Sequence, residues 1–473
     1  MNPATVVPRV PARRLDEQGR PHVDTRAILT LALPLIANSA AQLVLGLTDV
    51  WFIARISTDA LAAVSAVHWL SLVVLVILAG VGIAVQTVVA QAQGAGRRSR
   101  ASQAVWTALW ALLLAAPLFV AAGLSMRWVL SPFGLPTQLV DLAAAFWLPR
   151  VSGSIFGAAV WALLGFFNGV GHPKVTVLIT AVMALSNALF NELFIFHLNL
   201  GVAGSGLATA AAQICGLAIA MTVFLRPYYR HHYRTWLTWK PKLRRIAAQF
   251  RLGLPMGLLY AGDLIGFSIF QIMMVRLGSV PGAATQVVMI LTAVSYLPGV
   301  GIALAGTTLV GQSVGAGDRA WAYVLGNRVI SMAALYMGGM GLLLALAAPW
   351  ILPLFVGAQD PQSAAVVALG LRLMWIAALY QFFDALNLSS GFCLRGAGDA
   401  LVPAALTIAC SWLVFVPVAH MLIFAPGQGW MDVLPQLGWG ASGGWIAVVV
   451  YTLLVGVALF WRWRSRAWQR LSI

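Results

Sequence analysis

Four carboxyl side chains lie inside long apolar stretches of this sequence: Asp49, Glu192, Asp263 and Asp384. At the depth of a membrane a carboxylate costs roughly 2.5–3.5 kcal/mol on insertion scales, so it usually faces a cavity or a partner. Such a group can bind a proton and a cation in turn, because burial favours its neutral form and an adjacent cation favours its ionised form. The four acids therefore indicate an ion or substrate path.

The alternative for each acid is a buried side chain that caps or braces a neighbouring helix. We favour the ion or substrate path for Asp49, Asp263 and Asp384, which lie deep in their apolar stretches. Glu192 lies closer to a helix end, and both interpretations stay open for it.

Polar residues at helical spacing accompany these acids. Asn187 and Asn191 are one helical turn apart and would hold Asp49 by hydrogen bonds if the first and fifth helices pack together. The alternative is that the two amides simply join two membrane helices. Tyr380 lies four residues before Asp384, so these two share a helix face and form, with Asp263, a candidate Na⁺ site.

The composition places these residues in an integral membrane protein. Of the 473 residues 61% are hydrophobic and 9% are charged, with a mean hydropathy of +0.88, whereas soluble domains carry about 25% charged residues. Apolar stretches of about 20 residues or more can each cross a hydrocarbon layer of about 30 Å as a helix. We expect twelve transmembrane helices, near 27–54, 59–93, 102–124, 138–170, 172–197, 202–226, 248–278, 281–313, 320–355, 361–396, 399–424 and 438–463.

The formal charge of +16 follows the expected membrane topology. With both termini in the cytoplasm, basic residues concentrate on the cytoplasmic side, near anionic lipid headgroups. This distribution predicts a multi-pass protein of the cytoplasmic (inner) membrane that contacts lipids and does not bind nucleic acid. Five of the 29 Lys and Arg are exceptions, namely Arg55, Arg127, Arg150, Arg276 and Arg372.

The N-terminal residues and the cysteines add little chemistry. The first 26 residues are polar and contain Arg and Pro but no apolar core, so they are not a signal peptide, and we expect a disordered tail. Cys215, Cys393 and Cys410 lie within or at the ends of predicted spans, where cysteine usually packs as a small residue.

The chain repeats itself. VVAQAQGAGRR at 88–98 returns as LVGQSVGAGDR at 309–319, an offset of 221 residues. Each half contains six spans, an even number, so both halves enter the membrane in the same direction. The Gly pairs of the repeat are typical of left-handed helix C-caps and tight turns. The acids are not repeated, since the offset places Phe270 opposite Asp49 and Gln42 opposite Asp263.

The predicted fold is therefore all-α and integral to the membrane, with twelve transmembrane helices in two pseudo-symmetric six-helix bundles. Two such bundles suit alternating access, in which a cleft opens to one side of the membrane and then to the other. The basic segment at 227–247, which links the two bundles, is expected to lie on the lipid headgroups. The expected regions are a cytoplasmic tail at 1–26, an N-terminal bundle at 27–226, the linker at 227–247, a C-terminal bundle at 248–463 and a cytoplasmic tail at 464–473.

Several segments resemble the MATE family of multidrug and toxin extrusion transporters, particularly its NorM-like branch, over essentially everything after residue 27. ALPLIANSAAQLVLGLTDVWFIARIS is similar to the family's first helix, and LSNALFNELFIF to its fifth. GLPMGLLYAGD resembles the start of helix seven, and YQFFDALNLSSGFCLRGAGD resembles helix ten. The resemblance implies a MATE fold and matches the family's site positions to Asp49, Asn187, Asn191, Asp263, Tyr380 and Asp384.

Two positions depart from the family pattern. The acid of helix seven is usually Glu, whereas this chain has Asp263, which is one methylene shorter. Glu192 stands where the pattern more often has an aromatic or apolar residue. Ion-coupling residues are therefore expected in the N-terminal bundle at Asp49, Asn187, Asn191 and Glu192 and in the C-terminal bundle at Asp263, Tyr380 and Asp384, with H⁺ and Na⁺ both open.

No GxxxxGK[ST] phosphate loop occurs, so an ion gradient is the expected energy source. We predict a monomeric secondary antiporter, not an enzyme and without a cofactor, that exports amphipathic, often cationic, organic compounds in exchange for H⁺ or Na⁺. One alternative is a lipid-linked oligosaccharide flippase of the same superfamily, which would line its cleft with intramembrane Arg. The other is an intramembrane enzyme, which needs a clustered nucleophile and base or a metal set, whereas the seven His are scattered.

Overall fold

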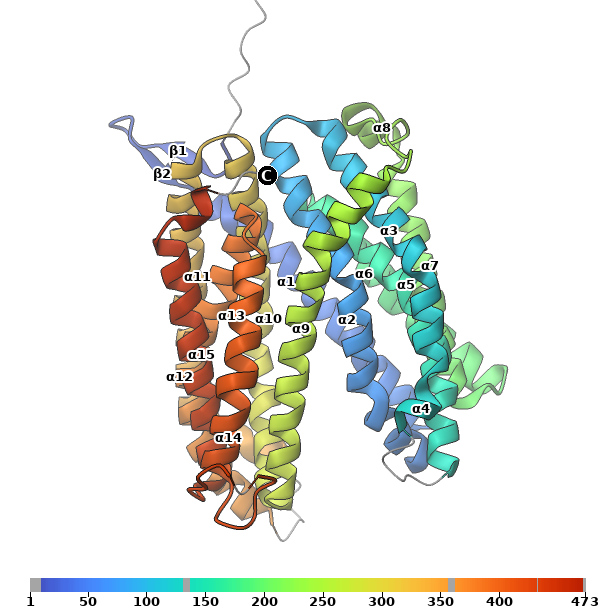
Figure 1. Cartoon of the computed structure of the whole chain (residues 1–473), viewed down its shortest axis with the longest axis vertical. Helices are drawn as coiled ribbons and strands as arrows, with labels where there is room; N and C mark the ends of the chain where they lie inside the picture. Colours follow the sequence, from blue (N-terminus) through green and yellow to red (C-terminus); the bar gives the residue numbers. More distant parts are fainter. Residues whose placement is uncertain (1–9, 131–136, 356–361, 432, 471–473) are drawn as a thin grey trace, which may run out of the picture. The chain divides into compact units, whose positions relative to one another are not determined.

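The computed structural model describes residues 10–130, 137–355, 362–431 and 433–470. Within these residues it is built almost entirely of long helices, as Figure 1 shows. Eleven helices are long and apolar enough to cross a membrane, or twelve if the bent pair Leu70–Ile77 and Ala79–Gly94 counts as one span. The predicted all-α fold with twelve spans is confirmed to this extent.

The helices follow the apolar stretches closely. The long ones are α1 (Thr25–Ala54), α2 (Thr58–Gly94), α3 (Arg98–Leu124), α5 (Thr137–Gly169), α6 (Pro173–Asn191), α7 (Gly201–Phe224), α9 (Leu243–Arg276), α10 (Ser279–Gly315), α11 (Arg319–Phe355), α12 (Ser363–Ala397) and α15 (Gly440–Arg464). The shorter pieces are α4 (Met126–Leu130), α8 (Pro227–Tyr233), α13 (Leu401–Cys410), α14 (Val416–Ile423) and the 3₁₀ helix η4 (Ala467–Arg470).

Two spans contain a π-helical segment. The segment η2 (Glu192–His197) continues α6, and η3 (Ser411–Phe415) joins α13 to α14, so that 401–423 forms one span. Such segments are rare and often lie at functional sites. Here they occur in the fifth and eleventh spans, which are corresponding spans of the two halves.

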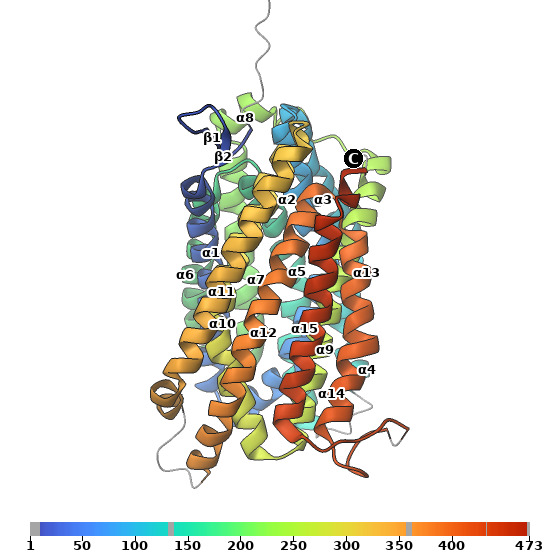
Figure 2. The ribbon, with the colours of Figure 1, turned by 90° about the vertical axis from the view of Figure 1, so that its left-hand side faces the viewer.

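The chain forms two compact units. Unit 1 comprises Met1–Ala261 with Thr307–Ala322, and unit 2 comprises Gly262–Gly306 with Tyr323–Ile473. The boundaries therefore lie inside α9, α10 and α11, whereas the sequence repeat suggests a division in the linker at 227–247. In unit 2, α12 and α15 lie side by side, which Figure 2 shows.

Close helix contacts explain why the first part of α9 belongs to unit 1. A Cβ added at Gly80 of α2 would overlap the backbone of Gly253 and Gly257 in α9. Gln249 of α9 also donates its side-chain amide to the carbonyl oxygen of Val81, at 2.9 Å. The two helices thus touch backbone to backbone, and this close approach is available only to glycine.

The repeated motif makes a reciprocal contact within unit 1. A Cβ at Gly94 would overlap the backbone of Gln312, and a Cβ at Gly315 would overlap the backbone of Gln91. Each copy of the motif is therefore packed against the other. The expected left-handed turns are confirmed at the second glycine of each pair, since Gly96 has φ +67° and Gly317 has φ +85°.

The N-terminal residues form a small hairpin, so the prediction of a disordered tail is wrong for residues 10–24. Strands β1 (Arg13–Leu15) and β2 (Pro21–Val23) pair antiparallel. Arg13 forms an ion pair with Asp318 at 3.3 Å, and the Trp321 indole donates to the carbonyl oxygen of Pro11 at 3.0 Å. These contacts to the α10–α11 turn supply order that polar composition alone does not indicate.

The linker is held by one face of α3. Ser102 donates to the carbonyl oxygen of Tyr233 at 2.6 Å, and the indoles of Trp106 and Trp110 donate to the carbonyl oxygens of Thr235 and Trp239 at 2.8 and 2.7 Å. The three donors are spaced four residues apart, which places them along one side of the helix. The linker is therefore fixed to unit 1 at three points.

We expect Gly94→Ala to lower the melting temperature of the detergent-purified protein by several degrees. The added methyl would force α2 away from the Gln312 backbone, and overpacking of this kind typically costs about 1–3 kcal/mol. Gly46→Ala is the matched control, since no atom lies within 4 Å of a Cβ there, and helix propensity favours Ala by about 0.5–1 kcal/mol. Equal melting temperatures for Gly94→Ala and wild type would contradict the reciprocal contact.

Candidate functional site

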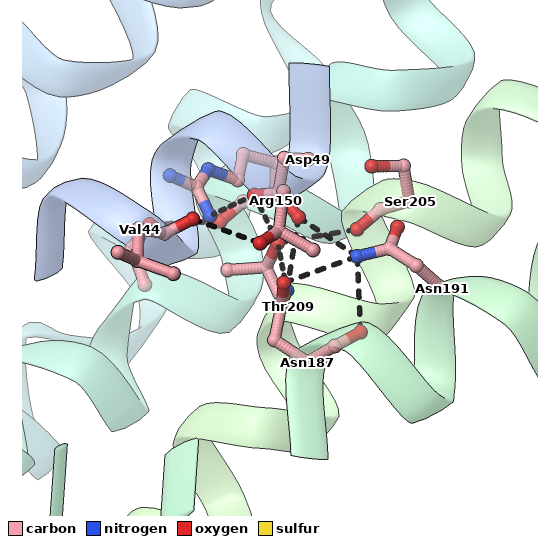
Figure 3. A network of polar contacts seen from close by, with 9 residues as sticks. Val44, Asp49, Arg150, Asn187, Asn191, Ser205 and Thr209 are labelled. Atoms are coloured by element: carbon pink, nitrogen blue, oxygen red, sulfur yellow. Dashed lines mark hydrogen bonds and ion pairs between the residues drawn. The ribbon is translucent and has the colours of Figure 1, made fainter. Parts of the chain in front are cut away.

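The Asp49 carboxylate is enclosed by side chains from α6 and α7 in unit 1, as Figure 3 shows. Its side chain is buried in the last third of α1. Asn187 and Asn191 each donate an amide N–H to Oδ1 at 2.9 Å. Thr209 donates its hydroxyl to Oδ2 at 3.0 Å. Three uncharged donors thus point at the two carboxylate oxygens.

The predicted packing of the first and fifth helices is what brings these groups together. α1 and α6 pack along much of their length. Asn187 and Asn191 are fully buried on the α6 face that meets α1. Further along the same interface Thr180 donates its hydroxyl to the side-chain oxygen of Asn38 at 2.5 Å. The hypothesis that the two asparagines hold Asp49 is confirmed in its geometry.

Two partners of Asp49 were not predicted from the sequence. Thr209 lies on α7, and Arg150 on α5 places Nη1 at 3.9 Å from Asp49 Oδ2. Only 11% of the Arg150 side chain and 8% of the Asp49 side chain is exposed, so the pair is nearly dry. In the sequence Arg150 stands out only as a basic residue off the cytoplasmic side, and a threonine in an apolar helix gives no signal.

Glu192 is placed away from this group. It is the first residue of η2, directly after Asn191, and its side chain is 47% exposed. It faces Arg55 at 3.9 Å, and exposed pairs of this kind contribute about 0–1 kcal/mol. This position favours the bracing alternative for Glu192.

A second polar group lies in unit 2, around the two other acids. Asp263 of α9 accepts a hydrogen bond from the Tyr451 hydroxyl of α15 at 2.6 Å. Asp384 of α12 is buried and accepts from Tyr380 and Asn387, both at 3.3 Å. The two carboxylates are close enough to interact electrostatically. The predicted association of Asp263, Tyr380 and Asp384 is therefore present in the structure.

Tyr451 and Asn387 are the partners in unit 2 that the sequence does not reveal. Tyr451 is 2% exposed, and its ring stacks on Phe415 with centroids 5.0 Å apart. Phe415 ends the π-helical segment η3, just as Asn191 immediately precedes η2. Both π-helical segments thus adjoin a buried carboxylate group. The sequence does not single out Tyr451, because a tyrosine in an apolar span is more commonly an interfacial anchor.

The unit 2 group contains the kind of oxygen ligands that an alkali cation needs. The carboxylates of Asp263 and Asp384 supply oxygen ligands, and the Tyr380 oxygen keeps lone pairs while its hydrogen goes to Asp384. Among the described residues no set of three or more His, Cys, Asp and Glu is arranged to hold a metal ion. Carboxylate and hydroxyl oxygens suit a hard cation or a proton, whereas softer transition metals favour nitrogen and sulfur ligands.

Comparison with known proteins agrees with this architecture. The MatE family model matches residues 34–193 and 255–421. The probable multidrug resistance protein NorM of Pseudomonas aeruginosa is 32% identical over 460 residues, covering 94% of this chain and 90% of that protein. Its counterpart in Pseudomonas putida is 31% identical over 468 residues, covering 94% and 96%.

Solved structures share the fold at low identity. A MATE protein in the straight conformation aligns with a TM-score of 0.79 at 19% identity, covering 94% of this chain and 96% of that one. A MOP superfamily transporter from Pyrococcus furiosus aligns with a TM-score of 0.80, also at 19% identity and with the same coverage. The membrane-spanning helices, the family model and these relatives together define a multi-pass membrane transporter. The chain belongs to the MatE family, among the NorM-type multidrug efflux transporters.

We expect Asp49→Asn and Arg150→Gln each to destabilise the purified protein, and the double variant to recover part of the loss. Each single change leaves one buried charge without its partner, which typically costs about 3–5 kcal/mol, whereas the double change removes both charges. Thermal unfolding of the four proteins in detergent gives the double-mutant cycle.

The exposed pair Arg13–Asp318 supplies the control cycle, with an expected coupling of about 0–1 kcal/mol. Strictly additive losses for Asp49→Asn and Arg150→Gln would show that the two charges do not compensate each other.

Proposed function

We propose that this transporter is a secondary antiporter that exports amphipathic, often cationic, organic compounds in exchange for H⁺ or Na⁺. It would act by alternating access between the two repeated halves, as a monomer in the inner membrane with both termini in the cytoplasm. The multidrug resistance names of the relatives support the substrate class. The observation that carries the coupling role is the paired Asp263 and Asp384 inside unit 2.

The unit 2 group favours ion exchange because its negative charges lack a basic partner. Within the described ranges neither Asp263 nor Asp384 forms an ion pair with Lys, Arg or His. When both are ionised they repel each other, and binding of a proton or Na⁺ removes that repulsion. Tyr451, Tyr380 and Asn387 donate to the ionised carboxylates. Loading and release of one cation would then alter how α9, α12 and α15 hold together.

Asp49 has a different chemical situation, because Arg150 already supplies a positive charge beside it. A further cation would be repelled by the guanidinium and would compete with it for the carboxylate. We therefore assign the main ion-coupling step to unit 2, whereas the ion-coupling role of Asp49, Asn187, Asn191 and Glu192 stays a prediction.

The two alternatives have less support. A flippase for a pyrophosphate-linked lipid would need uncompensated Arg at membrane depth, and the charge of Arg150 is balanced by Asp49. An intramembrane enzyme would need clustered catalytic groups. The His, Cys, Asp and Glu of the described residues do not form a metal-binding set.

We expect the double variant Asp263→Asn/Asp384→Asn to lose gradient-driven efflux of a cationic dye from proteoliposomes. Two amides cannot exchange a proton or hold Na⁺ as carboxylates do, while they keep nearly the same shape. Imposed pH and Na⁺ gradients, applied separately, identify the ion. Asp141→Asn is the control, since Asp141 forms an exposed pair with Arg127. Unchanged efflux in the double variant would remove unit 2 from the coupling step.

We expect a cysteine introduced at Gly427 to react with an impermeant maleimide added outside cells, and one at Ser99 to react only after permeabilisation. Gly427 lies in the turn between α14 and α15, whereas Ser99 lies in the first turn of α3, between the basic residues Arg98 and Arg100. The background protein would have Cys215, Cys393 and Cys410 replaced by alanine. Labelling of Ser99 in intact cells would reverse the proposed orientation.

A further inference from the structure

The two copies of the repeated motif differ in the residues that follow the second glycine. The first copy reads GAGRRSR and the second reads GAGDRAW, so at the offset of 221 residues Asp318 replaces Arg97. Trp321 likewise replaces Arg100. Both copies use their glycines for the same left-handed turn and the same close contact. The two replacements therefore indicate a task that only the second copy performs.

Both replaced positions contact the N-terminal hairpin. Arg13 donates from Nη1 to Oδ2 of Asp318 at 3.3 Å, and its guanidinium lies over the Trp321 ring, 5.4 Å from the centroid. The Trp321 indole donates to the carbonyl oxygen of Pro11 at 3.0 Å. An arginine at either position, as in the first copy, would place a second positive charge beside Arg13. The side chains that distinguish the second copy are therefore the ones that hold the hairpin.

Asp318 also fixes the start of α11. Its Oδ1 accepts a hydrogen bond from the backbone N–H of Trp321 at 2.8 Å, which caps the first turn of the helix. The two oxygens of this carboxylate thus serve different segments of the chain, since one holds α11 and the other holds the hairpin. An asparagine here would keep the cap and lose the charge.

The other end of the hairpin is attached to α1. Asp24 caps α1 by accepting from the backbone N–H groups of Arg26 and Ala27 at 2.9 and 3.3 Å. Its own backbone N–H donates to the carbonyl oxygen of Ala12 at 2.9 Å, and Arg14 lies 3.6 Å from its carboxylate. Ala12 has φ +53°, a conformation that alanine keeps only where its surroundings hold it. The hairpin is thus a defined connection between the start of α1 and the start of α11.

The turn that the hairpin holds lies where the chain passes between the two units. Residues 307–322 belong to unit 1, whereas 262–306 and 323–473 belong to unit 2. The end of α10 and the first residues of α11 are held in unit 1 by the reciprocal glycine contact and by the hairpin. A movement of this turn away from the rest of unit 1 would therefore have to break the hairpin contacts.

These hairpin contacts are suited to opening. The ion pair of Arg13 and Asp318 is partly exposed, with 40% and 31% of the two side chains accessible. Ion pairs at such positions are weak and are screened by salt. The glycine contact, in contrast, is backbone to backbone and does not depend on charge.

We propose that the N-terminal hairpin is a strap on the turn between α10 and α11, which opens during each transport cycle and limits its rate. This inference rests on the alternating access of the proposed function and adds a restraint that lies outside both carboxylate groups. When closed, the strap joins the turn to α1, the helix that carries Asp49. A hairpin that only completes the fold would stay closed throughout the cycle.

The decisive test closes the strap covalently. Arg13→Cys and Asp318→Cys, introduced together into protein whose native cysteines are replaced by alanine, are bridged with a short bis-maleimide that contains a cleavable disulfide. We expect the bridge to abolish gradient-driven efflux of ethidium from proteoliposomes, and cleavage by dithiothreitol to restore it. The matched control bridges Asp16→Cys and Arg20→Cys, an ion pair within the hairpin, and should leave efflux unchanged.

Loosening the strap should have the opposite effect. Arg13→Gln and Asp318→Asn each remove the ion pair, and the asparagine keeps the cap of α11. We expect efflux at low salt to rise by up to about fivefold, the range that corresponds to an exposed ion pair, and the difference from wild type to shrink at high salt. Hydrogen–deuterium exchange of the backbone at 318–325 should be faster in both variants, and Arg20→Gln should change neither measurement.

Full efflux from the bridged protein would overturn the strap. So would slower efflux together with a lower melting temperature in Arg13→Gln, since that is the result expected of a hairpin that only completes the fold. Neither result affects the export function. Failure of the wild-type protein to export ethidium under a pH or Na⁺ gradient would instead overturn the proposed function, and with it the transport role of the strap.

Discussion

The absence of water at membrane depth is the constraint on which this structure depends. A charged or polar side chain there must find its partners inside the protein, and Asp49 finds them on three other helices. Each partner fixes the rotation of its helix, because a turn of a few tens of degrees would remove the contact. The Asp49 group therefore orders α1, α5, α6 and α7 as well as providing chemistry.

The same constraint limits how helices can approach each other. Association in a membrane gains little from burying apolar surface, since lipid is equally apolar, so close backbone contact matters more. Gly94 and Gly315 supply this contact between α2 and α10, and Gly80, Gly253 and Gly257 supply it between α2 and α9. These contacts draw the first part of α9 and the last part of α10 into unit 1, across the boundary of the sequence repeat.

The two halves share a framework but differ in the charges placed within it. Unit 1 holds a neutral pair of Asp49 and Arg150, whereas unit 2 holds Asp263 and Asp384 with neutral donors around them. A π-helical segment adjoins each group, in the corresponding span of each half. A duplicated scaffold can thus hold groups of different charge in its two halves, since a few inserted side chains decide the charge of each group.

The sequence by itself determined the properties that depend on neighbours along the chain. Hydropathy gave the twelve spans, the 221-residue offset gave the repeat, and helical spacing put Asn187 and Asn191 on one face. Only the tertiary structure decided that Thr209 and Arg150 meet Asp49, that Tyr451 meets Asp263, and that Glu192 points to Arg55 instead. The reason is that such contacts depend on the rotation and depth of helices distant in sequence, and neither quantity leaves a periodic signal in the chain.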